Sequence, residues 1–201
     1  PISNVEVKIA EDGEILIKGP NVMKGYFKDP DKTAEVMSGD YFHTGDKGEI
    51  DPDGFIKITG RKKEMFKTSG GKYIIPTLIE NDLKESNFIE QVMVIGENQK
   101  MPAALIQLNF EFVQEWIERK KIDLETTPEA ICTSDIIIER IQKEVSKSNQ
   151  GFGKWEQIKR FELTPDVWSI EGGHLTPTMK MKRSVIYGLY KDLVSKIYTD
   201  V

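Results

Sequence analysis

The chain has 201 residues, of which 28 are lysine or arginine and 33 are aspartate or glutamate, so its formal charge is −5. There is no overall basic excess of the kind that nucleic-acid binding favours. The single cysteine, Cys132, excludes a disulfide framework within the chain and fits a reducing compartment, so we expect a cytoplasmic protein. No histidine lies at the sequence distance from Cys132 that is typical of a catalytic dyad or of a pair of metal ligands. Cys132 is therefore expected to be a buried structural thiol rather than a nucleophile.

No apolar run approaches the roughly 20 residues that a membrane-spanning helix needs, and no signal peptide is visible. The first residue is Pro1 rather than methionine and a strand-like pattern follows at once, so we expect a fragment of a longer protein. The basic run from Arg61 to Lys72 leaves peripheral contact with lipid headgroups open.

Residues 1–59 have the pattern of short strands and turns. Asp12-Gly13, between two runs of alternating apolar residues, predicts a first hairpin. Asp51-Pro-Asp-Gly54 predicts a second hairpin, because proline presets one backbone angle and glycine accepts a positive one. In the long connection between them, residues 31–37 are expected to form one or two helical turns.

From residue 60 onward, helical spacing alternates with strand candidates, which places a domain boundary near Gly60 to Lys63. Pro76–Glu85 begins with proline and keeps its apolar residues on one face, which predicts a helix. The other expected elements are strands at 91–95, 103–108 and 155–163, helices around 112–117 and 128–145, and one final helix over 185–197.

A loop near the end of the chain holds the first candidate for chemistry. In Leu175–Arg183, Pro177 fixes one backbone angle and the flanking threonines add local hydrogen bonds, so Lys180 stands on a semi-rigid loop. A lysine in this position suits an oxygen of a carboxylate or a phosphate. An exposed lysine in a basic turn is the alternative, which these residues alone favour.

A second group of candidates lies upstream. Gly45 lets the backbone turn before Asp46, whose carboxylate can accept two neighbouring ribose hydroxyls. One hairpin separates Asp46 from Arg61 and returns its ends to one edge, so both side chains can face one pocket. Ser69-Gly70-Gly71 offers a backbone that a narrow ligand can approach closely. Each of these pieces alone is common in turns and loops.

Taken in order, five runs of the chain carry a resemblance. They are Gly13–Gly19, Gly25–Pro30, Tyr41–Asp46, Gly60–Gly71 and Thr176–Arg183. Together they resemble the C-terminal part of the AMP-forming acyl-CoA synthetases, a superfamily that includes luciferases and adenylation domains. The Leu-Thr-Pro-Thr form of the last run is most similar to the long-chain fatty acid branch.

The resemblance implies a ligase that works in two steps. ATP and a long-chain fatty acid form an acyl-adenylate and pyrophosphate, and the thiol of CoA then displaces AMP. In such enzymes a small C-terminal domain rotates between the steps. ATP, CoA and Mg²⁺ are the implied cofactors, with the magnesium site expected in an N-terminal part that is missing here.

The resemblance also implies roles for individual residues. Asp46 would bind the ribose hydroxyls, and Arg61 would bind nearby on the nucleotide. Lys63 matches the hinge position, and Lys180 matches the lysine that bridges the substrate carboxylate and the phosphate during adenylation. The loop of Ser69, Gly70 and Gly71 would line the pantetheine tunnel in the second step.

The chain departs from the family pattern in two ways. Met179 stands where many relatives have glycine before the catalytic lysine. Neither a glycine-, serine- and threonine-rich phosphate loop nor a Tyr-Gly-x-Thr-Glu-like motif occurs in the chain. We therefore expect the moving domain and its hinge without most of the active site, and an isolated chain that is nearly inactive.

For the fold, we expect residues 1–59 to be a β-rich tail of the large N-terminal domain. Residues 60–201 should form a mobile α+β domain, a small mixed sheet with packed helices, with the hinge near residues 61–63. The missing N-terminal domain is the expected partner, nucleic acid is not, and apolar surface left bare in the tail leaves self-association open. The alternatives are a fatty acyl-AMP ligase that loads a carrier protein and a non-catalytic interaction module of the same fold.

Overall fold

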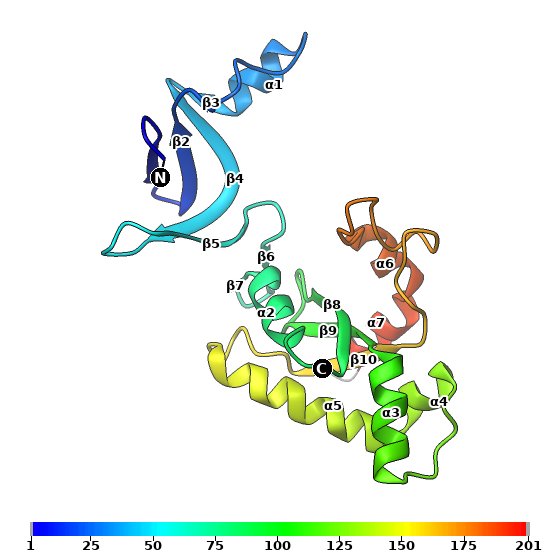
Figure 1. The fold of residues 1–201 in the computed structure, drawn as a ribbon. Helices are drawn as coiled ribbons and strands as arrows, with labels where there is room; N and C mark the ends of the chain where they lie inside the picture. Colours follow the sequence, from blue (N-terminus) through cyan, green and yellow to red (C-terminus); the bar gives the residue numbers. More distant parts are fainter. Residues whose placement is uncertain (1, 200–201) are drawn as a thin grey trace. The chain divides into compact units, whose positions relative to one another are not determined.

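The computed structural model describes residues 2–199 and divides the chain into two compact units, one ending at Met65 and one beginning at Phe66 (Figure 1). Residue 60, where the sequence suggests a boundary, lies in β5 (Ile56–Arg61), which pairs with β4 (Tyr41–Ile50) inside the first unit. The interpretation of the two parts as the tail of a large domain and a mobile domain stays a prediction.

The first unit is a five-stranded antiparallel sheet with the ten-residue strand β4 at its centre. Both predicted hairpins are confirmed, since β1 pairs with β2 and β4 pairs with β5. The expected helical turns form α1 (Pro30–Glu35), where the side chain of Asp29 accepts the N–H of Lys32. The other strands are β1 (Glu6–Ile9), β2 (Glu14–Lys18) and β3 (Met37–Ser38).

Strand β4 is visibly curved (Figure 1), and its pairing with β5 is interrupted between Lys47 and Gly48. A Cβ atom on Gly48 would lie 2.5 Å from the carbonyl oxygen of Lys57 and 2.6 Å from Cδ1 of Ile15. No side chain fits there without displacing the backbone of the neighbouring strand. Glycine therefore allows the close strand packing next to Asp46.

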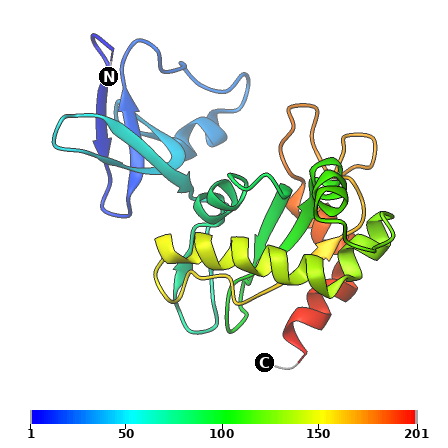
Figure 2. The ribbon, with the colours of Figure 1, turned by 60° about the horizontal axis from the view of Figure 1, so that its bottom comes forward.

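The second unit contains a three-stranded sheet in the order β10-β9-β8, with β9 parallel to β10 and antiparallel to β8. The predicted small mixed sheet with packed helices is thereby confirmed. Figure 2 shows α5 lying across the sheet. The strands are β6 (Phe66–Lys67), β7 (Tyr73–Ile74), β8 (Ile89–Ile95), β9 (Ala103–Leu108) and β10 (Arg160–Thr164). The helices are α2 (Pro76–Leu83), α3 (Phe110–Lys120), α4 (Pro128–Thr133), α5 (Asp135–Ser148), the 3₁₀ turn η1 (Asn149–Gly151), α6 (Arg183–Leu189) and α7 (Lys191–Tyr198).

Strand β9 is buried on both faces and separates two hydrophobic cores. Ala104, Ile106 and Leu108 belong to the core that includes residues of α2, α3, α4 and α5. Ala103 and Leu105 belong to the core that includes residues of α6 and α7. Successive side chains of a strand point to opposite faces, so helices cover both sides of this sheet. This packing makes the second unit a rigid support for its loops.

Three of the expected elements differ in the structure. The helix expected around 128–145 is two helices, α4 and α5, because Ser134 between them has an extended backbone with a ψ of 125°. The strand expected over 155–163 begins only at Arg160, because the side chain of Asn149 binds both the N–H and the carbonyl of Ile158 and holds this approach as a turn. The single final helix is two helices that meet at Tyr190. The hydroxyl of Tyr190 donates to Asp166 at 2.9 Å, and its ring stacks on Trp168, so tertiary contacts hold the residue where the helix breaks.

Candidate functional site

Asp46 and Arg61 face each other on β4 and β5, and Asp46 Oδ1 lies 3.0 Å from Arg61 Nε. Gly45 precedes this pair with a positive φ of 72°, but it lies inside β4, so the strand is distorted there and does not make the sharp turn that the sequence predicts. Asp46 Oδ1 is buried and, although within ion-pair distance of Arg61, has no well-aligned hydrogen bond among residues 2–199. The Arg61 side chain is 57% exposed. The Asp46 side chain as a whole is 24% exposed, so the pair combines a partly accessible acceptor with an accessible cation.

A buried carboxylate that the sequence interpretation missed forms hydrogen bonds with the chain neighbours of this pair. Glu14, on β2, is 3% exposed and accepts the N–H of Gly45 at 2.9 Å. Its Oε2 lies 3.0 Å from Nδ1 of His43 and 2.9 Å from Nζ of Lys62. Glu14 thereby ties down the residue before Asp46 and the residue after Arg61. A glutamate within the apolar run of β2 is the sequence signal that could have revealed it.

We expect Glu14→Gln to weaken the first unit and to remove part of its acid sensitivity. Burial disfavours the Glu14 carboxylate, but hydrogen bonds from His43, Lys62 and Gly45 outweigh burial and lower its pKa below the ordinary 4.5. A lowered folded pKa contributes stability above the unfolded pKa and loses it as the pH falls through the folded value. The loss for the variant at neutral pH should be about 1–3 kcal/mol.

Hydrogen exchange of peptides from β4 and β5, corrected for intrinsic rates, measures this effect in the chain itself. Protection should fall below about pH 4.5 in the natural chain and fall less steeply in Glu14→Gln. The exposed neighbour Glu11, as Glu11→Gln, is the matched control. An unchanged pH profile in Glu14→Gln would contradict the assignment of the acid sensitivity to this carboxyl.

Lys63 lies in a tight turn that leaves β5, directly before the end of the first unit. The N–H groups of Glu64 and Met65 both reach the carbonyl of Arg61, at 3.1 and 3.2 Å. Lys62 is anchored to Glu14 and, at 2.7 Å, to Asp12, while the Lys63 side chain is exposed. The first residue after the anchor is therefore Lys63, a suitable place for a backbone pivot.

The Ser69–Gly71 loop is the tip of the β6–β7 hairpin. Thr68 closes it by donating its N–H to Lys72 at 2.9 Å, and Gly71 has a φ of +80°. Ser69 donates its N–H to the carbonyl of Gln99 at 2.9 Å, so the tip is fastened to the loop between β8 and β9. Its residues are exposed, and the glycines leave the backbone open to a narrow ligand.

The Lys180 loop is a small closed hairpin. Leu175 and Met181 form an isolated β-bridge, and Thr176 donates its N–H to the carbonyl of Lys180 at 2.8 Å. The hydroxyl of Thr176 accepts the N–H of Lys180 at 3.1 Å. The Lys180 side chain is exposed, and within residues 2–199 its Nζ makes no hydrogen bond or ion pair. The threonines thus rigidify the loop as predicted, and its lysine remains accessible.

Met179 adopts a backbone conformation that favours glycine. Its φ is +60°, in the left-handed region, where a residue with a Cβ atom is disfavoured by about 1–2 kcal/mol. Met179 is 63% exposed, so packing offsets little of this strain. Methionine therefore occupies this position of the loop at an energetic cost.

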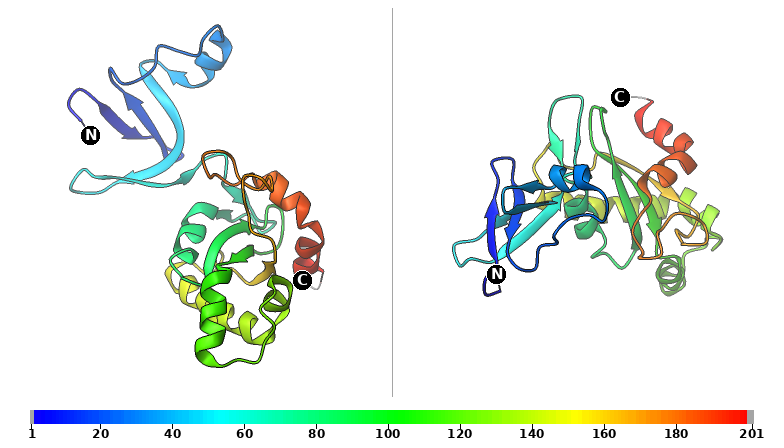
Figure 3. Two further views of the ribbon diagram at one scale, coloured as in Figure 1. Left: turned by 45° about the vertical axis from the view of Figure 1, so that its right-hand side comes forward. Right: turned by 90° about the horizontal axis from the view of Figure 1, so that it is seen from above.

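Each predicted residue thus has a defined place within its own unit. Asp46 and Arg61 are paired in the first unit, and Lys63 follows them there. Lys180 and the Ser69–Gly71 loop belong to the second unit, where they lie at different ends (Figures 2 and 3). Within that unit the structure does not bring the two loops together.

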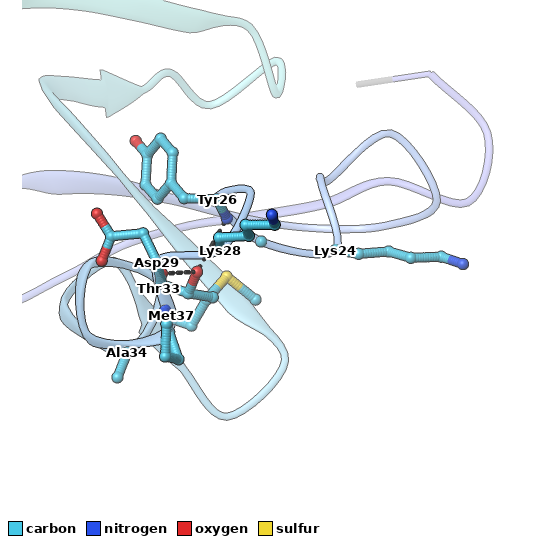
Figure 4. Close-up of a pocket in the computed structure, with 9 residues that line it drawn as sticks. Lys24, Tyr26, Lys28, Asp29, Thr33, Ala34 and Met37 are labelled. Atoms are coloured by element: carbon cyan, nitrogen blue, oxygen red, sulfur yellow. Dashed lines mark hydrogen bonds between the residues drawn. The ribbon is translucent and has the colours of Figure 1, made fainter.

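A cavity of about 490 Å³ lies elsewhere in the first unit, in the connection around α1 (Figure 4). The hydroxyl of Thr33 lies at its wall, where it accepts the N–H of Tyr26 at 2.9 Å and donates to the carbonyl of Asp29 at 2.8 Å. None of the predicted site residues lines this cavity. Its lining residues are Lys24, Gly25, Tyr26, Lys28, Asp29, Pro30, Thr33, Ala34 and Met37.

Metal binding, a reactive cysteine and a membrane-spanning helix are three further features to look for in residues 2–199. Among residues 2–199, no group of three or more His, Cys, Asp or Glu side chains is arranged so that it could hold a metal ion. Cys132 is half-buried, and burial is the main cause that raises the pKa of its thiol to about 12. Such a thiol stays protonated at neutral pH, which fits the structural role expected for it. None of the described helices has the length and apolar character needed to span a bilayer.

Comparison with known families decides the classification. Residues 64–201 match the family described as the AMP-binding enzyme C-terminal domain. The chain belongs to this family. The resemblance seen in the sequence is thereby confirmed, and this AMP-binding C-terminal domain accounts for the whole second unit.

Curated relatives cover almost all of the chain. The long-chain-fatty-acid–CoA ligase FadD15 of Mycobacterium tuberculosis is 34% identical over 198 residues, which are 98% of this chain and 33% of that protein. Human long-chain-fatty-acid–CoA ligase 1 is 36% identical over 194 residues, or 94% of this chain and 28% of that protein. The AMP-binding C-terminal domain and the sheet before it thus span about a third of the length of these relatives.

Solved structures show the same fold. The adenylation domain of a carboxylate reductase from Mycobacterium chelonae matches all of this chain and 31% of its own, with a TM-score of 0.74 and 20% identity. The corresponding domain from Segniliparus rugosus, in complex with AMP and a co-purified carboxylic acid, covers 99% of this chain with a TM-score of 0.75 and 21% identity. That match takes in 32% of the Segniliparus rugosus chain.

Proposed function

We propose that this chain is the C-terminal part of a ligase that activates a long-chain fatty acid with ATP and transfers the acyl group to CoA. The observation that carries the proposal is the pair of Asp46 and Arg61, whose side chains are 24% and 57% exposed, so a ligand can reach both the carboxylate and the guanidinium. The names of the curated relatives, which are long-chain-fatty-acid–CoA ligases, support the substrate class.

In the first step, a carboxylate oxygen of the fatty acid attacks the α-phosphorus of ATP, and pyrophosphate leaves. Asp46 accepts hydrogen bonds from the ribose hydroxyls, and Arg61 contacts the nucleotide beside them. Lys180 is assigned a place between the two anions. Its exposed ammonium offsets the repulsion between carboxylate and phosphate as they approach each other. The Mg²⁺ that accompanies ATP has no assigned ligands in this chain.

In the second step, the sulfur of CoA attacks the carbonyl carbon of the acyl-adenylate, its thiol proton is released to the solvent, and AMP leaves with the electrons of the broken carbon–oxygen bond. The exposed Ser69–Gly71 backbone lines the path of the pantetheine arm. Lys63 is the pivot between the two arrangements, directly after the anchored Lys62. A cytoplasmic location with peripheral membrane contact through the basic segment belongs to this proposal as well.

A carboxylate panel on the full-length product of the gene tests the proposal. We expect ATP–pyrophosphate exchange with long-chain fatty acids and loss of free CoA thiol, detected with a thiol reagent, in the same reaction. Exchange without thiol loss, together with acyl transfer to a carrier protein, would favour the acyl-AMP ligase instead. No exchange with any carboxylate would leave the non-catalytic module as the better interpretation. The isolated chain should form little acyl-CoA.

A further inference from the structure

A partly buried ion pair at the base of the Lys180 loop joins three elements of the second unit. Glu80, in α2, is 4% exposed, and its two carboxylate oxygens lie 2.7 and 2.6 Å from Nη2 of Arg183. The same carboxylate accepts the N–H of Val94, in β8, at 2.8 Å. Arg183 also donates from Nη1 to the carbonyl of Val94 at 3.3 Å. Arg183 is the first residue of α6 and stands three positions after Lys180.

The pair completes the free edge of the sheet. Strand β8 has β9 on one side and no strand on the other. At this edge the N–H of Val94 is bound by Glu80, and its carbonyl is bound by Arg183. The two side chains thus replace the neighbouring strand that Val94 lacks, and they satisfy polar groups that would otherwise be buried without partners. A planar guanidinium suits this geometry better than an ammonium, because its several donors lie in one rigid plane.

The Lys180 loop is anchored at both of its ends. At the first end, Leu175 is 1% exposed, and the carbonyl of His174 accepts the N–H of Lys182 at 2.8 Å. At the second end stands Arg183 with its bond to Glu80. Between these anchors Met179 has a positive φ, and Lys180 is exposed. The hydrogen bonds of Thr176 with Lys180 fix the shape of the loop, and its two anchored ends fix how the loop stands on the rest of the unit.

We propose that Glu80 and Arg183 are positioning residues that orient the Lys180 loop for acyl-adenylate formation, an inference that rests on the proposed function. Neither side chain touches the reacting atoms. Their contribution acts through the backbone from Arg183 to Lys180. The Ser69–Gly71 face does not depend on them, because the hairpin tip is held by its own closure and by Gln99.

Arg183→Lys in the full-length product is the first test, because it keeps the charge and removes the planar fork. A displacement of about 1 Å at a reacting group can cost about 100-fold in rate, so we expect kcat for adenylation to fall about 10- to 100-fold. The KM for ATP and for the fatty acid should stay unchanged. The transfer of a preformed acyl-adenylate to CoA should keep its rate.

A double variant separates positioning from a general loss of structure. If Arg183 acts only through Lys180, then Lys180→Ala with Arg183→Lys should adenylate no more slowly than Lys180→Ala alone. Multiplied losses in the double variant, or equal losses in both half-reactions of Arg183→Lys, would overturn the inference. Arg140→Lys is the matched control, because Arg140 forms a partly buried ion pair with Glu144 within α5, away from the loop. It should leave both half-reactions unchanged.

Hydrogen exchange of this chain provides a readout that does not depend on activity. Arg183→Lys and Glu80→Gln should each speed exchange about tenfold or more at residues 176–182, while β9 keeps its protection. Unchanged hydrogen exchange at residues 176–182 would contradict the proposal that Glu80 and Arg183 orient the loop, even if adenylation slowed. If the natural full-length protein shows no adenylation with any carboxylate, the proposed function fails, and the exchange result alone decides whether the pair orients the loop.

Discussion

Replacing Lys180 with alanine should slow acyl-adenylate formation by about 100-fold or more and leave thioester formation from a preformed acyl-adenylate intact. The first step brings two anions together, and a positioned cation offsets their repulsion in the transition state. The second step joins a thiol to a carbonyl carbon and has no such repulsion to overcome. ATP–pyrophosphate exchange measures the first step, and single-turnover acyl transfer from a synthetic acyl-adenylate to CoA measures the second.

The control for this experiment is Lys191→Ala, which removes an exposed lysine at the start of α7 and should change neither rate. The Lys180 loop is closed by backbone bonds and by the hydroxyl of Thr176, none of which involves the lysine side chain, so the alanine variant should keep its fold. Equal losses in both half-reactions would show that Lys180 is not specific to adenylation.

Replacing Asp46 with asparagine should raise the KM for ATP by about 10- to 100-fold, because a hydrogen bond to a charged acceptor contributes about 1.5–3 kcal/mol. Asparagine keeps the shape of the side chain but removes the charge beside Arg61 and half of its acceptor capacity. The KM for the fatty acid should not change. Initial rates of ATP–pyrophosphate exchange at varied ATP give these constants.

A ribose analogue makes the test of Asp46 specific. The natural protein should discriminate against 2′-deoxy-ATP, whereas Asp46→Asn should discriminate much less, because the acceptor that reads the hydroxyl is already weakened. Glu49→Gln, in the same strand, is the control, since Glu49 forms an exposed pair with Lys57 that contributes little. Equal discrimination in the natural protein and in Asp46→Asn would exclude contact between this carboxylate and the ribose.

Much of the first unit could be predicted because its contacts are local. The turn residues before Gly13 and Gly54 define two hairpins, and the register of the second hairpin places Asp46 opposite Arg61. Glu14 escaped prediction for the opposite reason. It lies 48 positions before Lys62 and 31 before Gly45, and no local pattern signals that these residues converge on its carboxylate.

The second unit shows the same division between local and distant contacts. Apolar periodicity located α2, β8 and β9, but the broken final helix depends on the contacts of Tyr190 with Asp166 and Trp168, 24 and 22 positions away in the chain. Met179 is a further case. Its residue type disfavours a left-handed backbone, and only the closed loop around it imposes that conformation.

The amino-acid sequence by itself determined the family, the fold class and the residues that carry the proposed chemistry, because family motifs and hairpin turns are short and keep their order. The tertiary structure alone decided which side chains support those residues. Glu80 and Arg183 are 103 positions apart, and they meet only because α2 and α6 pack against the sheet that has β8 at its edge. A partly buried ion pair of this kind is stable only when both partners arrive with good geometry, which the folded chain supplies and a linear pattern does not encode.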